Sequence, residues 1–224
     1  MKKKLSLSLS LIIIAIVTTI SGCLKDDGTN ISYPDVTAVS DTIFGTLKIR
    51  QVDTSGNSIV AWPHGTAVIK AIEAGTDVIA TGTVNAEGNF TLILPATAQG
   101  IYFISLATVA YQQGGSIKAT PETLRLMGST QFKVEYTENS VAKTMMVSLC
   151  TLKTDFSVDK SYFYNFYDSD GTFKGTGAGA EANKFDWTFS KGWGLVESFK
   201  IYSTSAAFDS KSVNTPQSDA IWVN

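Results

Sequence analysis

Short runs of Val, Ile, Thr, Phe and Tyr, separated by Gly, Asn and Asp, fill the chain after Asp41. β-Branched and aromatic side chains favour strands, whereas the separating residues favour turns. Three of the separating segments contain a glycine that can adopt positive φ, namely Ser55-Gly56-Asn57, Gly75-Thr76-Asp77 and Glu87-Gly88-Asn89. Short strands at this spacing are typical of antiparallel sandwiches. The pattern predicts an all-β fold.

The same runs predict where individual strands lie. We expect strands at 43–52, 66–73, 78–84, 89–94, 101–109, 130–137, 141–150, 156–167, 172–176, 184–190, 195–203 and 219–223. The only helix candidate is Thr120–Gly128, which has a capping Thr, a Pro in the first turn and a Gly at its end. The alternation of Leu124 and Leu126 in this segment fits a strand equally well.

Length and composition set the number of domains. The chain has 224 residues, of which 44% are hydrophobic and 17% charged, so it can bury a substantial core. Gly, Thr, Asn, Ser, Pro and Asp dominate 28–40, which indicates a flexible tether. We therefore predict two consecutive antiparallel β-sandwich domains, at 41–128 and 129–224, after a signal peptide at 1–22 and a tether at 23–40.

The N-terminus has the pattern of a signal peptide. Lys2, Lys3 and Lys4 form a positive segment, and a Leu/Ile/Val-rich run from Leu5 to Ile20 follows it. Sixteen helical residues span about 24 Å, which is shorter than the roughly 30 Å hydrocarbon core of a bilayer. A permanent transmembrane span is therefore the less favoured alternative.

The residues Ile20-Ser21-Gly22-Cys23, which end this apolar run, resemble the bacterial lipobox. The resemblance implies that Cys23 receives a lipid and becomes the first residue of the mature chain. Several acyl chains such as palmitate on one cysteine hold a protein stably on a membrane. The alternative is an ordinary secretory signal with an incidental cysteine.

Two further short motifs concern export and modification. Lys25, Asp26 and Asp27 resemble the surface-export signal of Bacteroidetes lipoproteins, which implies the outer membrane with the protein facing the cell exterior; the alternative is a solvated linker. Asp41-Thr42-Ile43 resembles the O-glycosylation signature of exported Bacteroidetes proteins and makes Thr42 a candidate site; the alternative is the start of a strand.

Two motifs with a glycine followed two positions later by an aromatic residue suggest the nature of the first domain. They are Gly88-Asn89-Phe90 and Gly100-Ile101-Tyr102, and they resemble the transthyretin-like, carboxypeptidase-regulatory-like sandwich over about 41–128. This resemblance implies a non-catalytic module. The segment 162–224 resembles the C-terminal β domains of Bacteroidetes lipoproteins, for which no chemistry can be carried over.

Charge and residue counts exclude several function classes. Without Lys2, Lys3 and Lys4 the chain has 15 basic and 20 acidic residues, which argues against a nucleic-acid partner. His64 is the sole histidine and lies in a predicted turn, and no Gly-x-Ser-x-Gly motif is present. We therefore predict no enzymatic activity, no cofactor and no metal centre. Cys150 lies in an apolar run and is predicted to be a buried small hydrophobe.

Asp168 and Asp170 could place two carboxylates on a Ca²⁺ ion. The third acidic or amide ligand and the distant Glu of a complete loop are missing. The favoured alternative is a hairpin turn at Asp170-Gly171.

The aromatic segment 162–167 presents two faces if it is a strand. Tyr162, Tyr164 and Phe166 share one face, and Phe163 and Tyr167 lie on the other with Asn165. The first face is a candidate platform on which sugar rings could stack. Packing against a neighbouring element is the favoured alternative, because aromatic residues dominate cores and interfaces.

These inferences together predict a non-catalytic, lipid-anchored cell-surface protein with a binding or structural role. The membrane is its first expected partner, through lipidated Cys23. A glycan or another outer-membrane protein is a further candidate partner. The alternative function is a carbohydrate-binding accessory lipoprotein of a polysaccharide-uptake system, and a hydrolase is a third, less favoured alternative.

Overall fold

The structure is a computed structural model, and it describes residues 36–37, 42–53, 56–73, 76–98, 103–128, 130–179, 182–200 and 207–224. These residues belong to one compact unit, Asp35–Asn224. Strands make up most of the described chain, and its single helix is α2, so the all-β prediction is confirmed. No helix in these ranges has the length and apolar character needed to cross a membrane.

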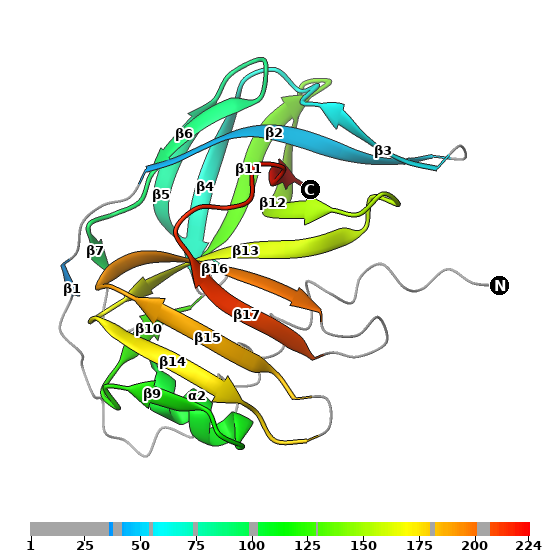
Figure 1. Cartoon of the computed structure of the whole chain (residues 1–224). Coiled ribbons are helices and arrows are strands. Elements are labelled where there is room, and N and C mark those ends of the chain that lie inside the picture. The colour runs from blue at the N-terminus through cyan, green and yellow to red at the C-terminus, as the bar shows by residue number, and fades with distance from the viewer. Residues whose placement is uncertain are drawn as a thin grey trace. The chain divides into compact units, whose positions relative to one another are not determined.

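The described elements follow one another in this order: β1 (Val36–Thr37), β2 (Thr42–Asp53), β3 (Gly56–Ala61), β4 (Ala67–Glu73), β5 (Asp77–Val84), β6 (Asn89–Ile93), β7 (Thr97–Ala98), β8 (Phe103–Ser105), α2 (Leu106–Gln113), β9 (Lys118–Thr120), β10 (Arg125–Met127), β11 (Gln131–Glu138), β12 (Val141–Leu152), β13 (Val158–Tyr167), β14 (Gly171–Thr176), β15 (Lys184–Phe189), β16 (Gly192–Lys200), β17 (Phe208–Val213) and β18 (Ile221–Val223). Figure 1 shows their arrangement.

Seven of the described strands pair into a closed ring in the order β11-β4-β5-β6-β2-β18-β12, and β12 closes it by pairing with β11 (Figure 1). The C-terminal strand β18 completes the ring. It pairs in parallel with β2, where Trp222 lies opposite Leu47, and antiparallel with β12, where Trp222 lies opposite Leu149. The last residues of the chain thus join strands from its two halves.

The two long strands β2 and β12 each change partners along their length. β2 pairs with β6 from Thr42 to Thr46 and with β3 from Lys48 onward. β12 pairs with β11 from Val141 to Val147 and with β13 from Leu149 onward. A strand of twelve residues is long enough to take part in two pairings.

Beyond the ring, the same hydrogen-bonded sheet continues from β12 in the order β13-β16-β17-β15-β14-β9, and we call this part the second sheet. β10 pairs with the other edge of β13 near Tyr167, and β8 pairs with β10. β15 and β17 run parallel to each other, whereas the other neighbours in this sheet are antiparallel. In Figure 1, α2 lies beside β9 at the bottom of the view.

Two main groups of buried side chains hold these strands together. The larger group fills the ring and includes Leu47, Phe90, Phe132 and Trp222. The smaller group joins α2 to the second sheet and includes Leu106, Leu124, Tyr167, Phe173 and Phe189. In this second group the rings of Tyr167 and Phe189 stack at 3.7 Å between centroids.

The structure corrects two predictions of local structure. The strand expected at 101–109 is wrong beyond Ser105, because α2 begins there: the Ser105 hydroxyl accepts a hydrogen bond from the Thr108 amide, and Gly114 closes the last turn. The helix expected at Thr120–Gly128 is also wrong, because this segment forms a turn followed by β10. Pairing of β10 with both β8 and β13 outweighs the local helix signals.

The sequence pattern did not predict all of the strands. The sequence did not predict β3 and β17, and both are paired in the structure. The hairpin predicted at Asp170-Gly171 is wrong, because β14 pairs with β15 and β9 rather than with β13. The division into sandwiches at 41–128 and 129–224 stays a prediction, and strand pairings cross it, since β11 pairs with β4.

Trp222 is the central ring of the larger core. It is 3% exposed, and its ring meets those of Phe90 and Phe132 edge to face at 5.3 and 4.9 Å. Gly45 leaves the space for it: a Cβ on Gly45 would lie 2.6 Å from Nε1 of Trp222 and 2.7 Å from Cε1 of Phe90. β2 therefore requires glycine at this position so that β18 can insert.

Gly45→Ala should lower the free energy of unfolding by about 1–3 kcal/mol, because the added methyl group overpacks a filled core. Chemical denaturation measures this change. Gly128→Ala is the matched control, since a Cβ there would meet only Cδ1 of Ile104 at an ordinary 3.7 Å. Equal stability of the two variants would contradict the role assigned to Gly45.

Candidate functional site

Most of the predicted anchoring and export residues cannot be placed. Cys23, Lys25, Asp26 and Asp27 lie outside the described residues. Thr42 is described: it is exposed at the start of β2, opposite Ile93 of β6. Its exposure leaves room for a glycan, and O-glycosylation of Thr42 stays a prediction.

The aromatic strand packs inside the protein. Tyr162 is 4% exposed and Phe166 0%, and Tyr164 is half-buried against the larger core. The face that carries these rings therefore does not form an exposed platform in this structure. The packing alternative accounts for the burial, because Tyr162 and Tyr164 pack against the larger core and Phe166 packs against Phe103 and Met127.

A shallow surface groove crosses three neighbouring strands of the ring. We call it the β4–β11–β12 groove; its volume is about 380 Å³. Nine residues line it, and most are small or polar: Thr66, Ala67, Val68, Glu135, Tyr136, Thr137, Ala142, Lys143 and Thr144. No motif in the sequence points to it, because its residues come from three strands and the bend before β4.

Strand register brings the groove residues together. Glu135 of β11 lies opposite Val68 of β4 on one side and opposite Thr144 of β12 on the other. Asn139 and Ser140 form the two-residue turn between β11 and β12 and have φ of 49° and 64°. Two positive φ angles are the requirement of a tight hairpin turn, which keeps β11 and β12 in fixed register.

Two glutamates of β11 form ion pairs in this part of the ring. Glu135 accepts from Lys70 at 2.6 Å and lies 3.0 Å from Lys133. Hydrogen bonds from these two lysines hold the pKa of the Glu135 carboxyl below its usual value. Three residues further along β11, Glu138 lies 3.1 Å from Lys143 and 3.3 Å from Nδ1 of His64.

His64 joins an aromatic cluster beside the groove. It lies in the bend between β3 and β4, and the side chain is 14% exposed. Its ring meets Tyr136 at 4.2 Å and Trp62 at 4.9 Å between centroids. The Trp62 indole donates to the Gly65 carbonyl at 2.6 Å and holds the bend in place. His64 and Glu138 are 74 positions apart in the sequence, so no local pattern could reveal their contact.

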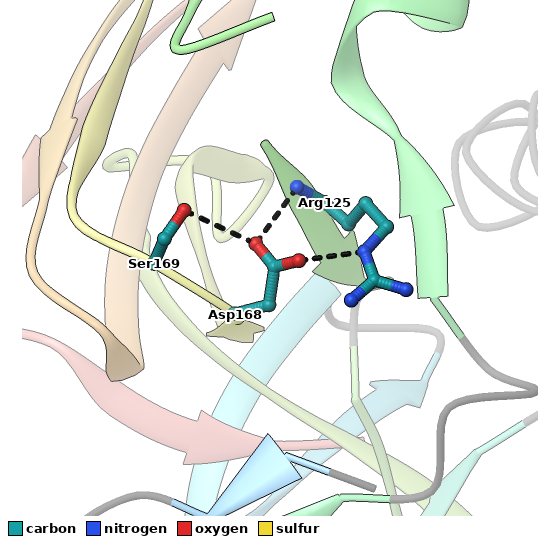
Figure 2. Close-up of polar contacts among 3 residues, drawn as sticks. All are labelled: Arg125, Asp168 and Ser169. Atoms are coloured by element: carbon teal, nitrogen blue, oxygen red, sulfur yellow. Dashed lines mark hydrogen bonds and ion pairs between the residues drawn. The ribbon is translucent and has the colours of Figure 1, made fainter. Parts of the chain in front are cut away.

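The carboxylates considered for Ca²⁺ already have protein partners. Figure 2 shows Asp168 accepting from the Arg125 guanidinium at 2.6 Å and from the Arg125 amide at 2.9 Å. Ser169 donates to the same carboxylate, and the Lys191 amide donates to Asp170 at 2.7 Å. These contacts tie β10 to the corner after β13. Among the described residues no group of His, Cys, Asp or Glu is arranged to hold a metal ion.

A buried carboxylate, Glu197, lies where the second sheet meets the larger core. The Tyr162 hydroxyl donates to Glu197 at 2.9 Å, and Lys160 and Lys211 each lie 3.4 Å from the same carboxylate. Burial alone would raise the pKa of Glu197, but Tyr162 and the two lysines outweigh it and lower the pKa. Burial raises the pKa of Tyr162 to about 12, so this hydroxyl stays a hydrogen-bond donor.

Cys150 behaves as the sequence predicts. It is buried and free of disulfide bonds, and burial raises the pKa of its thiol to about 11. A thiol with this pKa carries little thiolate at neutral pH, so Cys150 is a packing residue rather than a nucleophile.

Comparisons with known proteins found no match to this chain among family models, curated proteins or solved structures.

Glu73 is a further buried acid, and like Glu197 it was not predicted from the sequence. It ends β4 with 5% exposure, and its carboxyl accepts a hydrogen bond from the Thr130 hydroxyl. Burial raises its pKa to about 8, although the bond from Thr130 acts in the opposite direction. Glu73 is therefore mostly protonated at pH 7.

A raised pKa makes stability depend on pH. The pKa of Glu73 is about 8 in the folded chain and 4.5 without burial. Its contribution to the free energy of unfolding is therefore fully present below about pH 4.5 and is lost as pH rises to about 8. Glu73→Gln should abolish this loss, which is on the order of a few kcal/mol. Denaturant titrations at pH 5 and pH 8.5 measure it. The exposed Glu87→Gln variant is the control, and a wild-type pH dependence in Glu73→Gln would contradict the assignment.

Proposed function

We propose that the chain is a lipid-anchored protein of the outer membrane, facing the cell exterior, with a non-catalytic role in binding or structure. The observation that carries this proposal is Ile20-Ser21-Gly22-Cys23 directly behind the apolar run from Leu5 to Ile20. Lys25, Asp26 and Asp27, which follow at once, support surface export.

A non-catalytic role agrees with how three of the described carboxylates are used. Glu135, Asp168 and Glu197 each contact a basic side chain that neutralises them. Catalytic acids and bases usually need a pKa close to the working pH and access to a substrate. Glu135 lines the exposed β4–β11–β12 groove, which offers a surface for binding. The ion pairs of Asp168 and Glu197 hold strands together.

The finer organisation is part of the proposal. A transthyretin-like sandwich over 41–128 and a second sandwich over 129–224 rest on sequence motifs alone. Gly88-Asn89-Phe90 lies at the turn into β6, where Phe90 enters the larger core, whereas 100–102 lies outside the described residues.

Cys23→Ala should abolish lipid incorporation and release the protein from the membrane fraction, because the acyl chains supply the membrane affinity. Metabolic labelling with a palmitate analogue, followed by fractionation, measures both effects. Cys150→Ala is the matched control, since it removes the other cysteine and should keep the label. Equal labelling of Cys23→Ala and wild type would end the lipoprotein proposal.

Replacement of Lys25, Asp26 and Asp27 by alanine should leave labelling intact and remove the protein from the cell surface. Protease treatment of whole cells, followed by detection of the intact chain, measures exposure. Alanine at Thr29, Asn30 and Ser32 of the predicted tether provides the control. If both variants are digested as fast as wild type, the charges form only a linker.

A further inference from the structure

We propose that one face of the ring rests on the membrane to which Cys23 anchors the chain. We call it the β2–β6 face and define it by four exposed residues, Thr42 and Phe44 on β2 and Thr91 and Ile93 on β6. This inference rests on the proposed function, because it states how a lipid-anchored fold is oriented on its membrane.

Two large apolar side chains project from the β2–β6 face into solvent. Phe44 is 71% exposed and Ile93 is 62% exposed. Strand register makes them neighbours, because Phe44 lies opposite Thr91 and Ile93 lies opposite Thr42. Diagonal pairs of this kind are about 7–8 Å apart, so the two side chains form one apolar patch. Contact of this patch with water is unfavourable, and transfer to the apolar part of a membrane relieves it.

The core does not require these two side chains. Successive residues of a strand point to opposite faces, and the inward positions next to Phe44 and Ile93 belong to Ile43 and Leu92. Ile43 is 2% exposed and Leu92 is 0% exposed, and both belong to the larger core. The apolar character of the outward positions therefore has no role in packing within the fold.

The chain enters the fold beside this patch. β1 pairs with β7, where Val36 lies opposite Ala98. β7 begins at Thr97, only four positions after Ile93, the last residue of β6. Val36 in turn comes 13 positions after Cys23. A flexible chain of this length has an average end-to-end distance of about 20 Å, so a lipid on Cys23 holds the patch close to the membrane surface.

The anchor makes a weak contact sufficient. Two apolar side chains alone would bind a membrane poorly, as a single short acyl chain does. Once the acyl chains hold the protein on the membrane, the second contact is intramolecular and its effective concentration is high. The patch therefore sets the orientation of the fold, whereas the lipid supplies the affinity.

The surroundings of the patch suit a lipid boundary. Thr81 and Thr83 of β5 are exposed and continue the β2–β6 face, because Thr83 lies opposite Thr91. None of the outward side chains named on β2, β6 and β5 is charged. Removal of water from a charged group costs far more than its removal from a hydroxyl group. The same lack of charge disfavours a partner that is recognised through charge.

The test compares two labelled positions on the full mature lipoprotein. The protein is placed in vesicles of phosphatidylethanolamine and phosphatidylglycerol, in which part of the lipid carries bromine on its acyl chains. Thr91→Cys places a fluorescent label opposite Phe44, and Thr144→Cys places the same label on an exposed position of β12. β12 is three strands from β6 in one direction round the ring and four in the other. Cys150 is buried and its thiol pKa is raised to about 11, so it reacts slowly with the label.

Brominated lipid should quench the label at position 91 at least about twofold more strongly than the label at position 144, because bromine reaches only fluorophores at the apolar boundary. Phe44→Thr combined with Ile93→Thr should reduce quenching at position 91 to the level at position 144. Threonine favours strands and both positions are exposed, so the melting temperature should remain close to that of wild type.

The matched control is Val52→Thr with Met146→Thr. It removes two apolar side chains that are also exposed, at 75% and 47%, but lie on β2 and β12 outside the β2–β6 face. The control should keep the quenching at position 91. Equal quenching at positions 91 and 144, or equal loss in both double variants, would overturn the inference.

Other occupants of the face give different results. A label at position 91 that is shielded from water but is not quenched by brominated lipid shows that something else covers the face. A doubled mass of the protein in detergent would then identify a second copy, and a glycan found on Thr42 by mass spectrometry would identify an attached sugar. Either result overturns the inference.

Palmitate labelling and flotation of the same vesicles separate this inference from the proposed function. A protein that carries palmitate and floats, but shows no stronger quenching at position 91, overturns the orientation and leaves the anchor standing. A protein that carries no palmitate and does not float overturns the anchor, and the orientation is overturned with it.

Discussion

Insertion of β18 between β2 and β12 is the interaction on which the ring depends. Without the backbone pairs of Trp222 with Leu47 and with Leu149, the ring order would be open between β2 and β12. The indole also fills the centre of the larger core, where it meets Phe90 and Phe132. Pairing and packing therefore act at the same residue. Burial of a Trp side chain is among the largest single contributions that a core can receive.

Charged side chains have two distinct uses in this protein. In the interior, Asp168 and Glu197 are matched by basic and hydroxyl partners, because a buried charge left alone would cost several kcal/mol. These pairs join β10 to the corner after β13, and β13 to β16. Around the groove, Glu135 and Glu138 hold neighbouring side chains in place while remaining partly exposed. Exposed pairs of this kind add little stability, so their effect is on geometry.

The proposed anchor and the β4–β11–β12 groove place different demands on the chain. Anchoring depends on Cys23 and the few residues around it, and it requires no particular fold. The groove depends on the register of β4, β11 and β12, because Glu135, Thr137 and Thr144 must lie side by side. A rigid sheet suits this second task, since paired strands hold surface side chains at fixed spacing.

The sequence by itself determined the all-β class and most strand positions, because alternation and turn residues act over a few neighbouring positions. The strands at 42–53, 131–138 and 158–167 lie within two residues of the ranges expected for them. It also contains every motif that supports the anchor, including Cys23. Tertiary structure alone decided that Trp222 pairs with Leu47, that 125–127 is a strand, and that His64 meets Glu138. These contacts join residues far apart in the chain or override local preference through packing, and no local pattern encodes either effect.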